Sequence, residues 1–184
     1  MDLQGVNEVG ILKGRRGGRR FKACNAQHTL PALSFRDFAP PQGAAMANDW
    51  NTMIIHEFRA NGGKVGGQFA GAPLLLLHSV GAKSGKTRVT PLMYQDLGHG
   101  RVAVFASKGG APTNPDWYHN LVANPRATVE IGAETFDVVA SVARGEERLR
   151  VFTAQKQRYP NFAEYERKTK REIPVIILER DGAA

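Results

Sequence analysis

The chain has very little cysteine, and this limits the kinds of site that it can hold. Its 184 residues include a single cysteine, Cys24, which excludes a disulfide within the chain and any zinc site built from several cysteines. The five histidines are scattered, without the HxxxH or HxH spacing that metal sites often show. We therefore expect no metal centre.

The chain also lacks long apolar runs, and its net charge is not acidic. A membrane-spanning helix needs about 20 apolar residues, whereas Leu74–Leu77 is long enough only for a buried strand. The net charge of +8 would suit an anionic partner: a nucleic acid, an anionic membrane surface or a phosphorylated cofactor. Residues 1–45 hold seven Lys and Arg against three acids, so the remainder is only mildly basic. This distribution argues against a nucleic-acid binder.

Residues 1–45 differ from the rest of the chain. They combine the sequence GRRGGRR (Gly14–Arg20) with several prolines and no sustained periodicity, which is typical of disorder. No apolar segment follows the basic cluster, so it is not a secretory signal, and we expect a cytoplasmic protein. One interpretation is a basic tail that contacts acidic lipid or nucleic acid. We favour the other, in which translation begins at Met46 and residues 46–184 form the structured domain.

After Met46 the hydrophobic pattern predicts alternating helices and strands. We expect a helix over Trp50–Ala60, capped by Asn48 or Asp49 and ended by Gly62-Gly63. Further helices are expected at Asn114–Val122, with Asn114 as cap and Pro115 in the first position, at Glu146–Gln157 and at Phe162–Lys168. Strands are expected at Leu74–Ser79, Arg88–Gln95, Arg101–Ser107, Ala127–Ile131, Thr135–Ala140 and Pro174–Glu179. Antiparallel strands with helices at the margins predict a small barrel or strongly curled sheet.

Two glycine-rich turns carry cations. They are Gly81–Arg88 (GAKSGKTR) and Ser107–Gly110 (SKGG), each after an expected strand. Glycine lets backbone N–H groups approach an anion closely, and the cations supply its counter-charge. The first turn lacks the Walker spacing, so an ordinary hairpin turn with solvated lysines stays open as an alternative. Together the turns favour a site for an elongated, phosphate-bearing ligand.

No catalytic constellation stands out. The chain shows no Ser/His/Asp or Cys/His set, and Ser107 is the best polar candidate for a catalytic role. His78 is more simply explained as a structural histidine. Trp117 and Tyr118 could wall a flat ring; the alternative is that both pack in the core, which is the better interpretation of Tyr118. This pattern suits an enzyme in which a cofactor performs the chemistry.

Four segments resemble the deazaflavin-dependent nitroreductase family, whose members bind coenzyme F420 in a split β-barrel. The resemblance implies an α+β fold, a split β-barrel of mostly antiparallel strands with flanking helices. It covers essentially everything after Met46. The matching segments are NDWNTMIIHEFRANGGKVGG (Asn48–Gly67), GAKSGKTRVTPL (Gly81–Leu92), ASKGGAPTNPDWYHNLVANP (Ala106–Pro125) and YPNFAEYERKTKREIPVIILER (Tyr159–Arg180).

The resemblance also implies which residues bind cofactor and substrate. The first turn and the Ser107–Gly110 turn would hold the phosphate and polyglutamate tail through Lys83, Ser84, Arg88 and Lys108. The deazaflavin ring would lie against Pro91, Leu92, Ala106 and Ser107, with Trp117, Tyr118 and Asn120 bordering the pocket. The substrate side would comprise Met93, Tyr159, Phe162 and Tyr165.

The activity that the resemblance implies is hydride transfer from reduced F420 to an apolar acceptor such as a quinone, an unsaturated lactone or a nitroaromatic. Some family members have tyrosine where this chain has Met93 and Phe162. The two missing hydroxyls disfavour nitroreduction of a particular drug-like compound and leave the cofactor site intact. Two alternatives stay open: an FMN-dependent oxidoreductase and a non-catalytic carrier of cofactor or lipid. An apolar quinone is also compatible with peripheral contact at the inner face of a membrane.

Overall fold

The computed structural model describes residues 44–182, with side chains from Asp49 onward. The predicted disordered extension lies outside the described residues, except that Ala44 and Ala45 begin the first helix. Its longer elements are, in chain order, α1 (Ala44–Ala60), β1 (Leu74–Val80), β2 (Thr87–Gly98), β3 (Arg101–Phe105), α2 (Asp116–Ala123), β4 (Arg126–Ile131), β5 (Glu134–Val142), α3 (Gly145–Arg158), α4 (Asn161–Lys168) and β6 (Val175–Arg180). Two short 3₁₀ turns are η2 (Gly67–Phe69) and η3 (Lys108–Gly110).

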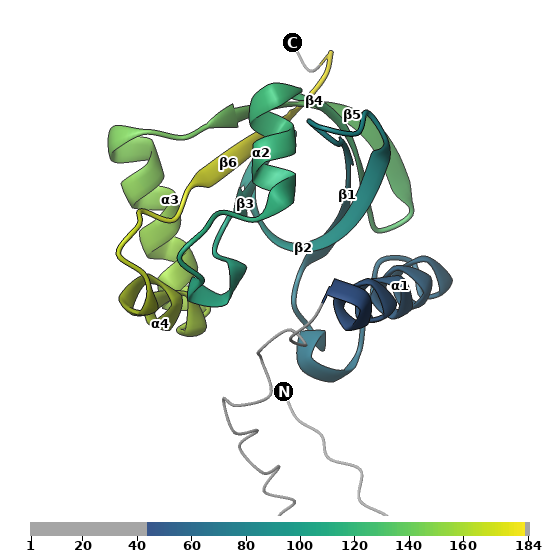
Figure 1. The fold of residues 1–184 in the computed structure, drawn as a ribbon, viewed down its shortest axis with the longest axis horizontal. Coiled ribbons are helices and arrows are strands. Elements are labelled where there is room, and N and C mark those ends of the chain that lie inside the picture. The colour runs from purple at the N-terminus through teal and green to yellow at the C-terminus, as the bar shows by residue number, and fades with distance from the viewer. Residues whose placement is uncertain (1–43, 183–184) are drawn as a thin grey trace, which may run out of the picture. The chain divides into compact units, whose positions relative to one another are not determined.

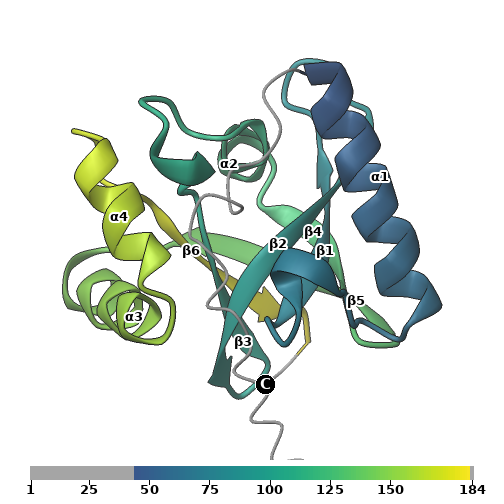
Figure 2. The same ribbon diagram turned by 90° about the horizontal axis from the view of Figure 1, so that it is seen from below.

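The strands close into a barrel in the order β1-β2-β3-β6-β5-β4, and every neighbouring pair is antiparallel. Figures 1 and 2 show α1 on one side of this barrel and the pair α3 and α4 on the other. The predicted α+β split barrel with flanking helices is confirmed. No helix within residues 44–182 is long and apolar enough to cross a membrane.

Strands that read as continuous apolar runs are buried on both faces. In β1, Leu75 and Leu77 point into the barrel interior, while Leu74 and Leu76 pack against α1. In β6 the interior residues alternate with Val175 and Ile177, which pack against α3 and α4. Three apolar clusters result: one inside the barrel and one beneath each group of helices. The pattern explains why LLLL and VIIL occur in strands of an antiparallel sheet, which usually alternate apolar and polar residues.

Several predicted boundaries were wrong by a few residues. Helix α1 begins at Ala44, so Asn48 and Asp49 lie inside it and do not cap it. Helix α2 begins at Asp116, and Pro115 occupies the cap position instead of the first helical position. Strand β2 continues to Gly98, whereas β3 ends at Phe105 because Ser107 already has helical backbone angles.

The C-terminal end of α1 is attached to the barrel by an ion-pair cluster. Arg59 donates to both carboxylate oxygens of Glu130 on β4, at 2.5 and 3.0 Å, and His78 Nε2 lies 2.6 Å from Glu130 Oε1. The hydrogen bond from Arg59 lowers the pKa of Glu130 below its ordinary value of 4.5. A carboxylate with a lowered folded-state pKa stabilises the fold above its unfolded pKa, and this contribution is lost as pH falls through the folded pKa.

Replacing Glu130 by glutamine is therefore expected to lower the free energy of unfolding at pH 7 by about 1 kcal/mol, because Arg59 is half exposed and a surface pair contributes little more. The difference from wild type should shrink as pH falls below 4.5. Urea unfolding at neutral and acidic pH measures both. Glu134→Gln is the control, since its 3.6 Å pair with Arg180 is more exposed. A difference that persisted unchanged in acid would contradict this account.

Candidate functional site

A largely apolar pocket opens between the barrel, α1, α2 and α4. Its cavity volume is about 200 Å³, within a hollow of about 840 Å³ that is partly open to solvent. The lining residues, in chain order, are Trp50, Gln68, Phe69, Pro91, Leu92, Met93, Phe105, Ser107, Lys108, Gly109, Pro115, Trp117, Asn161, Phe162 and Tyr165. Eight of them are residues that the sequence predicted for the site.

The barrel side of the pocket is formed by β2, the end of β3 and the loop after it. Pro91, Leu92 and Met93 come from the middle of β2, and Phe105 is the last residue of β3. Ser107 lies two residues after Phe105 and is half-buried. Its hydroxyl has no hydrogen-bond partner among the described residues, so it is free to bind a ligand.

Helix α4 supplies the facing wall. The Phe162 ring meets the Tyr165 ring edge-on at 5.5 Å and the Phe105 ring at 5.4 Å. Asn161, which is only 6% exposed, donates from Nδ2 to the Tyr165 hydroxyl at 3.2 Å. Because the tyrosine oxygen accepts this bond, its own proton remains available to a ligand in the pocket. The wall thus combines apolar rings with one hydroxyl donor.

A third wall was not predicted from the sequence. Trp50 of α1 and Phe69 of η2 lie with ring centroids 5.5 Å apart, and Gln68 adds a polar side chain beside them. The sequence predicted Trp50 at the start of a helix, and the residue packs against the apolar cluster beneath that helix. Gln68 and Phe69 lie in a segment without periodicity, so no sequence signal marked them.

The first glycine-rich turn presents cations to solvent. Lys83, Lys86 and Arg88 are exposed, and none of them has an ion-pair partner among residues 49–182. The turn is held to α2 because Asn120 Oδ1 accepts the N–H of Ala82 at 3.0 Å. The N-terminal end of that same helix lines the pocket through Trp117. One rigid element therefore connects the cationic turn to the pocket.

Seven predicted site residues lie outside the pocket lining. Lys83, Ser84 and Arg88 lie in or directly after the first turn, where the Ser84 hydroxyl accepts the N–H of Lys86 at 3.3 Å. Ala106 is fully buried. The other three are engaged elsewhere: Asn120 binds Ala82 and Ser79, Tyr118 packs on the barrel core, and Tyr159 packs on the cluster under α3 and α4.

His78 is bound to Glu130 on the side of the barrel that carries α1, as a structural histidine would be. Among residues 49–182 no group of three or more His, Cys, Asp or Glu side chains could hold a metal ion. The chemistry available in the pocket itself is therefore hydrogen bonding by Ser107, Tyr165 and Gln68, one ammonium group on Lys108, and apolar contact.

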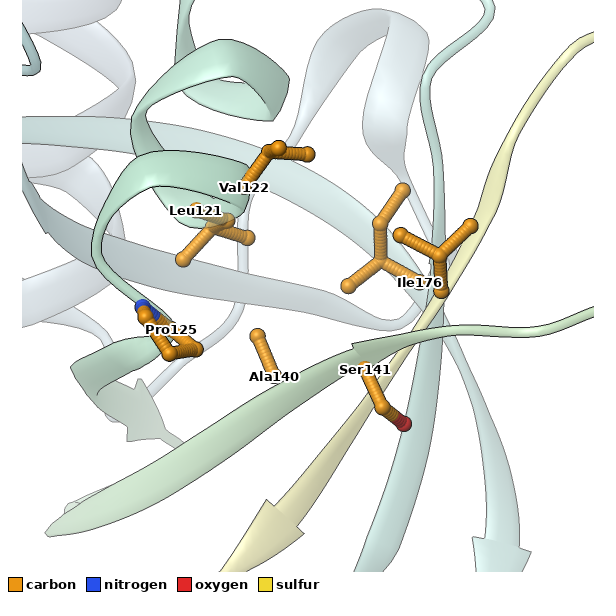
Figure 3. Close-up of a pocket in the computed structure, with 7 residues that line it drawn as sticks. Leu121, Val122, Pro125, Ala140, Ser141 and Ile176 are labelled. Atoms are coloured by element: carbon orange, nitrogen blue, oxygen red, sulfur yellow. The ribbon is translucent and has the colours of Figure 1, made fainter.

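A second hollow lies apart from this pocket, between α2, β5 and β6 (Figure 3). Its cavity volume is about 160 Å³, and it is lined by Leu121, Val122, Pro125, Ala140, Ser141, Val142 and Ile176. Ser141 is its only lining residue with a polar side chain, and it includes no predicted site residue. Convergent polar groups are what usually orient a ligand, so the first pocket is the better candidate.

Comparison with protein families shows which known proteins the chain is similar to. A family model described as F420H(2)-dependent quinone reductase matches residues 50–180. An F420H(2)-dependent quinone reductase of Mycobacterium tuberculosis strain H37Rv is 38% identical over 127 residues, which cover 67% of this chain and 85% of that protein. A putative F420H(2)-dependent quinone reductase of the same strain is 42% identical over 106 residues, covering 58% of this chain and 88% of that protein.

Two solved structures are similar as well. The structure of an F420-H2 dependent reductase is 44% identical, with a TM-score of 0.53, and the match covers 58% of this chain and 94% of that one. A protein described as a domain-swapped dimer is 40% identical, with a TM-score of 0.55, and the match covers 72% of this chain and 98% of that protein's chain. The resemblance drawn from the sequence is therefore confirmed.

Proposed function

Because the chain belongs to the F420H(2)-dependent quinone reductase family, we propose that its first pocket binds reduced coenzyme F420 beside an apolar quinone. The enzyme class is an F420H2-dependent oxidoreductase. The observation that carries the proposal is that helix α2 joins two features. Its Trp117 lines an apolar pocket that contains the free Ser107 hydroxyl, and its Asn120 binds the turn whose cations have no ion-pair partner among residues 49–182. A flat ring with a long anionic tail fits both parts.

The cationic residues are proposed to hold the anionic tail. Lys83 and Arg88 are exposed without ion-pair partners among residues 49–182, and Lys108 lies at the pocket with its ammonium 3.3 Å from the Thr113 hydroxyl. A guanidinium can bind a phosphate through two parallel hydrogen bonds, and ammonium groups add charge. The Ser84 hydroxyl and the backbone N–H groups of the turn are further donors.

The ring is proposed to lie along β2 and the loop after β3. Pro91 and Leu92 offer an apolar surface, Trp117 closes the pocket on the side of α2, and the Ser107 hydroxyl can bond to the ring or stabilise charge on the acceptor. The cofactor supplies the hydride. The chain's part is to hold donor and acceptor in contact and to exclude water, since a bound pair at the correct geometry reacts far faster than a free one.

The acceptor is proposed to lie between the α4 wall and the Trp50–Phe69 wall. Met93 and Phe162 both line the pocket, so the positions where some family members have tyrosine are apolar here. Tyr165 then provides the hydroxyl that can donate to a quinone carbonyl oxygen. A cytoplasmic enzyme with peripheral contact at the inner membrane face would meet apolar quinones where they dissolve.

Fluorescence titration of the purified chain with F420 and with FMN tests the proposal. We expect saturable binding of F420, and mixing the reduced F420 complex with menadione should then oxidise the cofactor. Tight binding of FMN alone would support the flavin alternative. Binding of reduced F420 without oxidation by any quinone would indicate a carrier. Failure to bind either cofactor would overturn the proposal.

A further inference from the structure

Arg171 lies outside the pocket, in the segment between α4 and β6, and binds the loop that lines it. Its guanidinium donates four hydrogen bonds to residues 106–114. Nη2 bonds to the carbonyl oxygens of Ala106 and Ser107, both at 2.9 Å. Nε bonds to the carbonyl oxygen of Ala111 at 3.0 Å, and Nη1 to Asn114 Oδ1 at 2.6 Å. One side chain thus holds both ends of the loop after β3.

The charge of Arg171 has no carboxylate partner among the described residues. Burial lowers the pKa of its guanidinium, although an arginine stays protonated in a protein at neutral pH. By contrast, five other arginines of the described chain each pair with an acid: Arg59, Arg101, Arg126, Arg148 and Arg180. A half-buried charge satisfied only by neutral oxygens is costly, which points to a role beyond general stability.

The loop that Arg171 binds has an unusual backbone. Lys108, Gly109 and Gly110 have φ angles of +47°, +62° and +84° in succession. A left-handed conformation is unfavourable for lysine, so the surroundings must impose it at Lys108. The internal bond from Gly110 N–H to the Ser107 carbonyl is 2.9 Å long, and Arg171 binds that same carbonyl. The guanidinium therefore binds the carbonyl of Ser107, the residue directly before the left-handed run.

We propose that Arg171 is a positioning residue that fixes the loop of residues 106–111 in the conformation that presents Ser107 and Lys108 to the cofactor. The inference rests on the proposed function for the identity of the ligand. Its structural part, the ordering of the loop, holds for the protein without cofactor. Arginine suits this role because its planar fork carries five N–H donors, whereas lysine offers a single ammonium.

The main test compares Arg171→Ala with Arg167→Ala, a matched loss of charge at an exposed arginine on α4. We expect Arg171→Ala to weaken F420 binding about tenfold or more, the change that ~1.4 kcal/mol produces and that a charge-assisted hydrogen bond can supply. In the cofactor-free protein, amide hydrogen exchange should rise about tenfold in residues 106–111. Exchange in α1 should stay unchanged, and Arg167→Ala should behave as wild type.

Chemical rescue distinguishes the loss of the guanidinium hydrogen bonds from a loss of side-chain volume or of positive charge alone. Millimolar ethylguanidinium should restore both F420 affinity and loop protection in Arg171→Ala, whereas ethylammonium, with the same charge, should not. Arg171→Lys should remain about as impaired as the alanine variant, and it serves as the test variant if Arg171→Ala does not fold. Wild-type affinity and loop protection in either folded variant would overturn the inference, as would faster exchange spread over the whole barrel.

The two proposals fail in different ways. If wild-type protein does not bind F420, the proposed function fails, and the exchange experiment still decides whether Arg171 orders the loop. If wild-type protein binds F420 and the Arg171 variants bind it equally well, the positioning inference fails and the proposed function stands.

Discussion

Replacing Gly110 by alanine is expected to lower the melting temperature by roughly 10 °C and to abolish detectable F420 binding. Gly110 has a φ of +84°, and a Cβ there would lie 2.8 Å from the Lys168 Cβ and 2.9 Å from the Tyr165 carbonyl oxygen. Left-handed backbone costs alanine about 1–2 kcal/mol and overpacking about 1–3 kcal/mol more. At roughly 2–4 °C per kcal/mol for a chain of this size, these costs give the expected shift. Thermal unfolding and F420 titration measure the two effects.

Gly98→Ala is the matched control for this prediction. Gly98 has nearly the same φ, +77°, but a Cβ there would meet no atom within 4 Å. The control therefore carries the backbone cost without the collision, and we expect a loss of only about 1–2 kcal/mol with F420 binding retained. Equal losses in the two variants would show that the packing of the loop on α4 is not what Gly110 provides.

The packing role of Gly110 could not be predicted from the sequence. The glycines of Ser107–Gly110 were interpreted as a place for backbone N–H groups to approach an anion. The structure shows that Gly110 allows the loop to pack against the backbone of Tyr165, far along the chain. A glycine needed for close packing and one needed for anion binding look the same in a sequence, because the packing partner is set by the tertiary fold.

The barrel itself was predictable because its strands carry unambiguous signals. Glycine turns separate them, and the apolar runs of β1 and β6 are too short for a core helix and are buried on both faces. Helix α1 was predicted too short because Asn48 and Asp49 are typical helix-capping residues, although both lie inside the helix. The helix continues through them to Ala44, since alanine is a good helix former.

In the site, residues marked by recognisable turns or by the family resemblance were predicted, and those with neither signal were not. Ser107 and Lys108 follow a strand and begin a glycine-rich turn, so they could be named from the sequence. Gln68 and Arg171 could not, because each reaches the site or its loop from a segment without regular pattern. Tyr118 and Asn120 were expected at the border of the pocket from the family resemblance. In the structure Tyr118 packs on the barrel core and Asn120 binds Ala82 and Ser79.

Replacing both Lys83 and Arg88 by alanine is expected to weaken F420 binding by about 100-fold, with the fold unaffected. Both side chains are exposed and lack ion-pair partners among residues 49–182, so their loss breaks no ion pair in that part of the free protein. A hydrogen bond to a charged group contributes about 1.5–3 kcal/mol, and we expect roughly tenfold for each single substitution by alanine. Fluorescence titration at fixed ionic strength measures the affinities, and thermal unfolding checks that the variants remain folded.

Lys86→Ala is the matched control, because it removes the same charge from the same turn. If Lys83 and Arg88 contact the phosphate and tail directly, their variants should lose far more affinity than Lys86→Ala. Direct contact also makes the loss depend on ligand, with little change for an uncharged deazaflavin ring that lacks the tail. Three equal losses that vanish at high salt would indicate diffuse electrostatic attraction, which is screened within about 10 Å at 0.1 M salt. Unchanged affinity in both the Lys83 and Arg88 variants would contradict the assignment of the tail to this turn and leave Lys108, at the pocket itself, as its only proposed anchor.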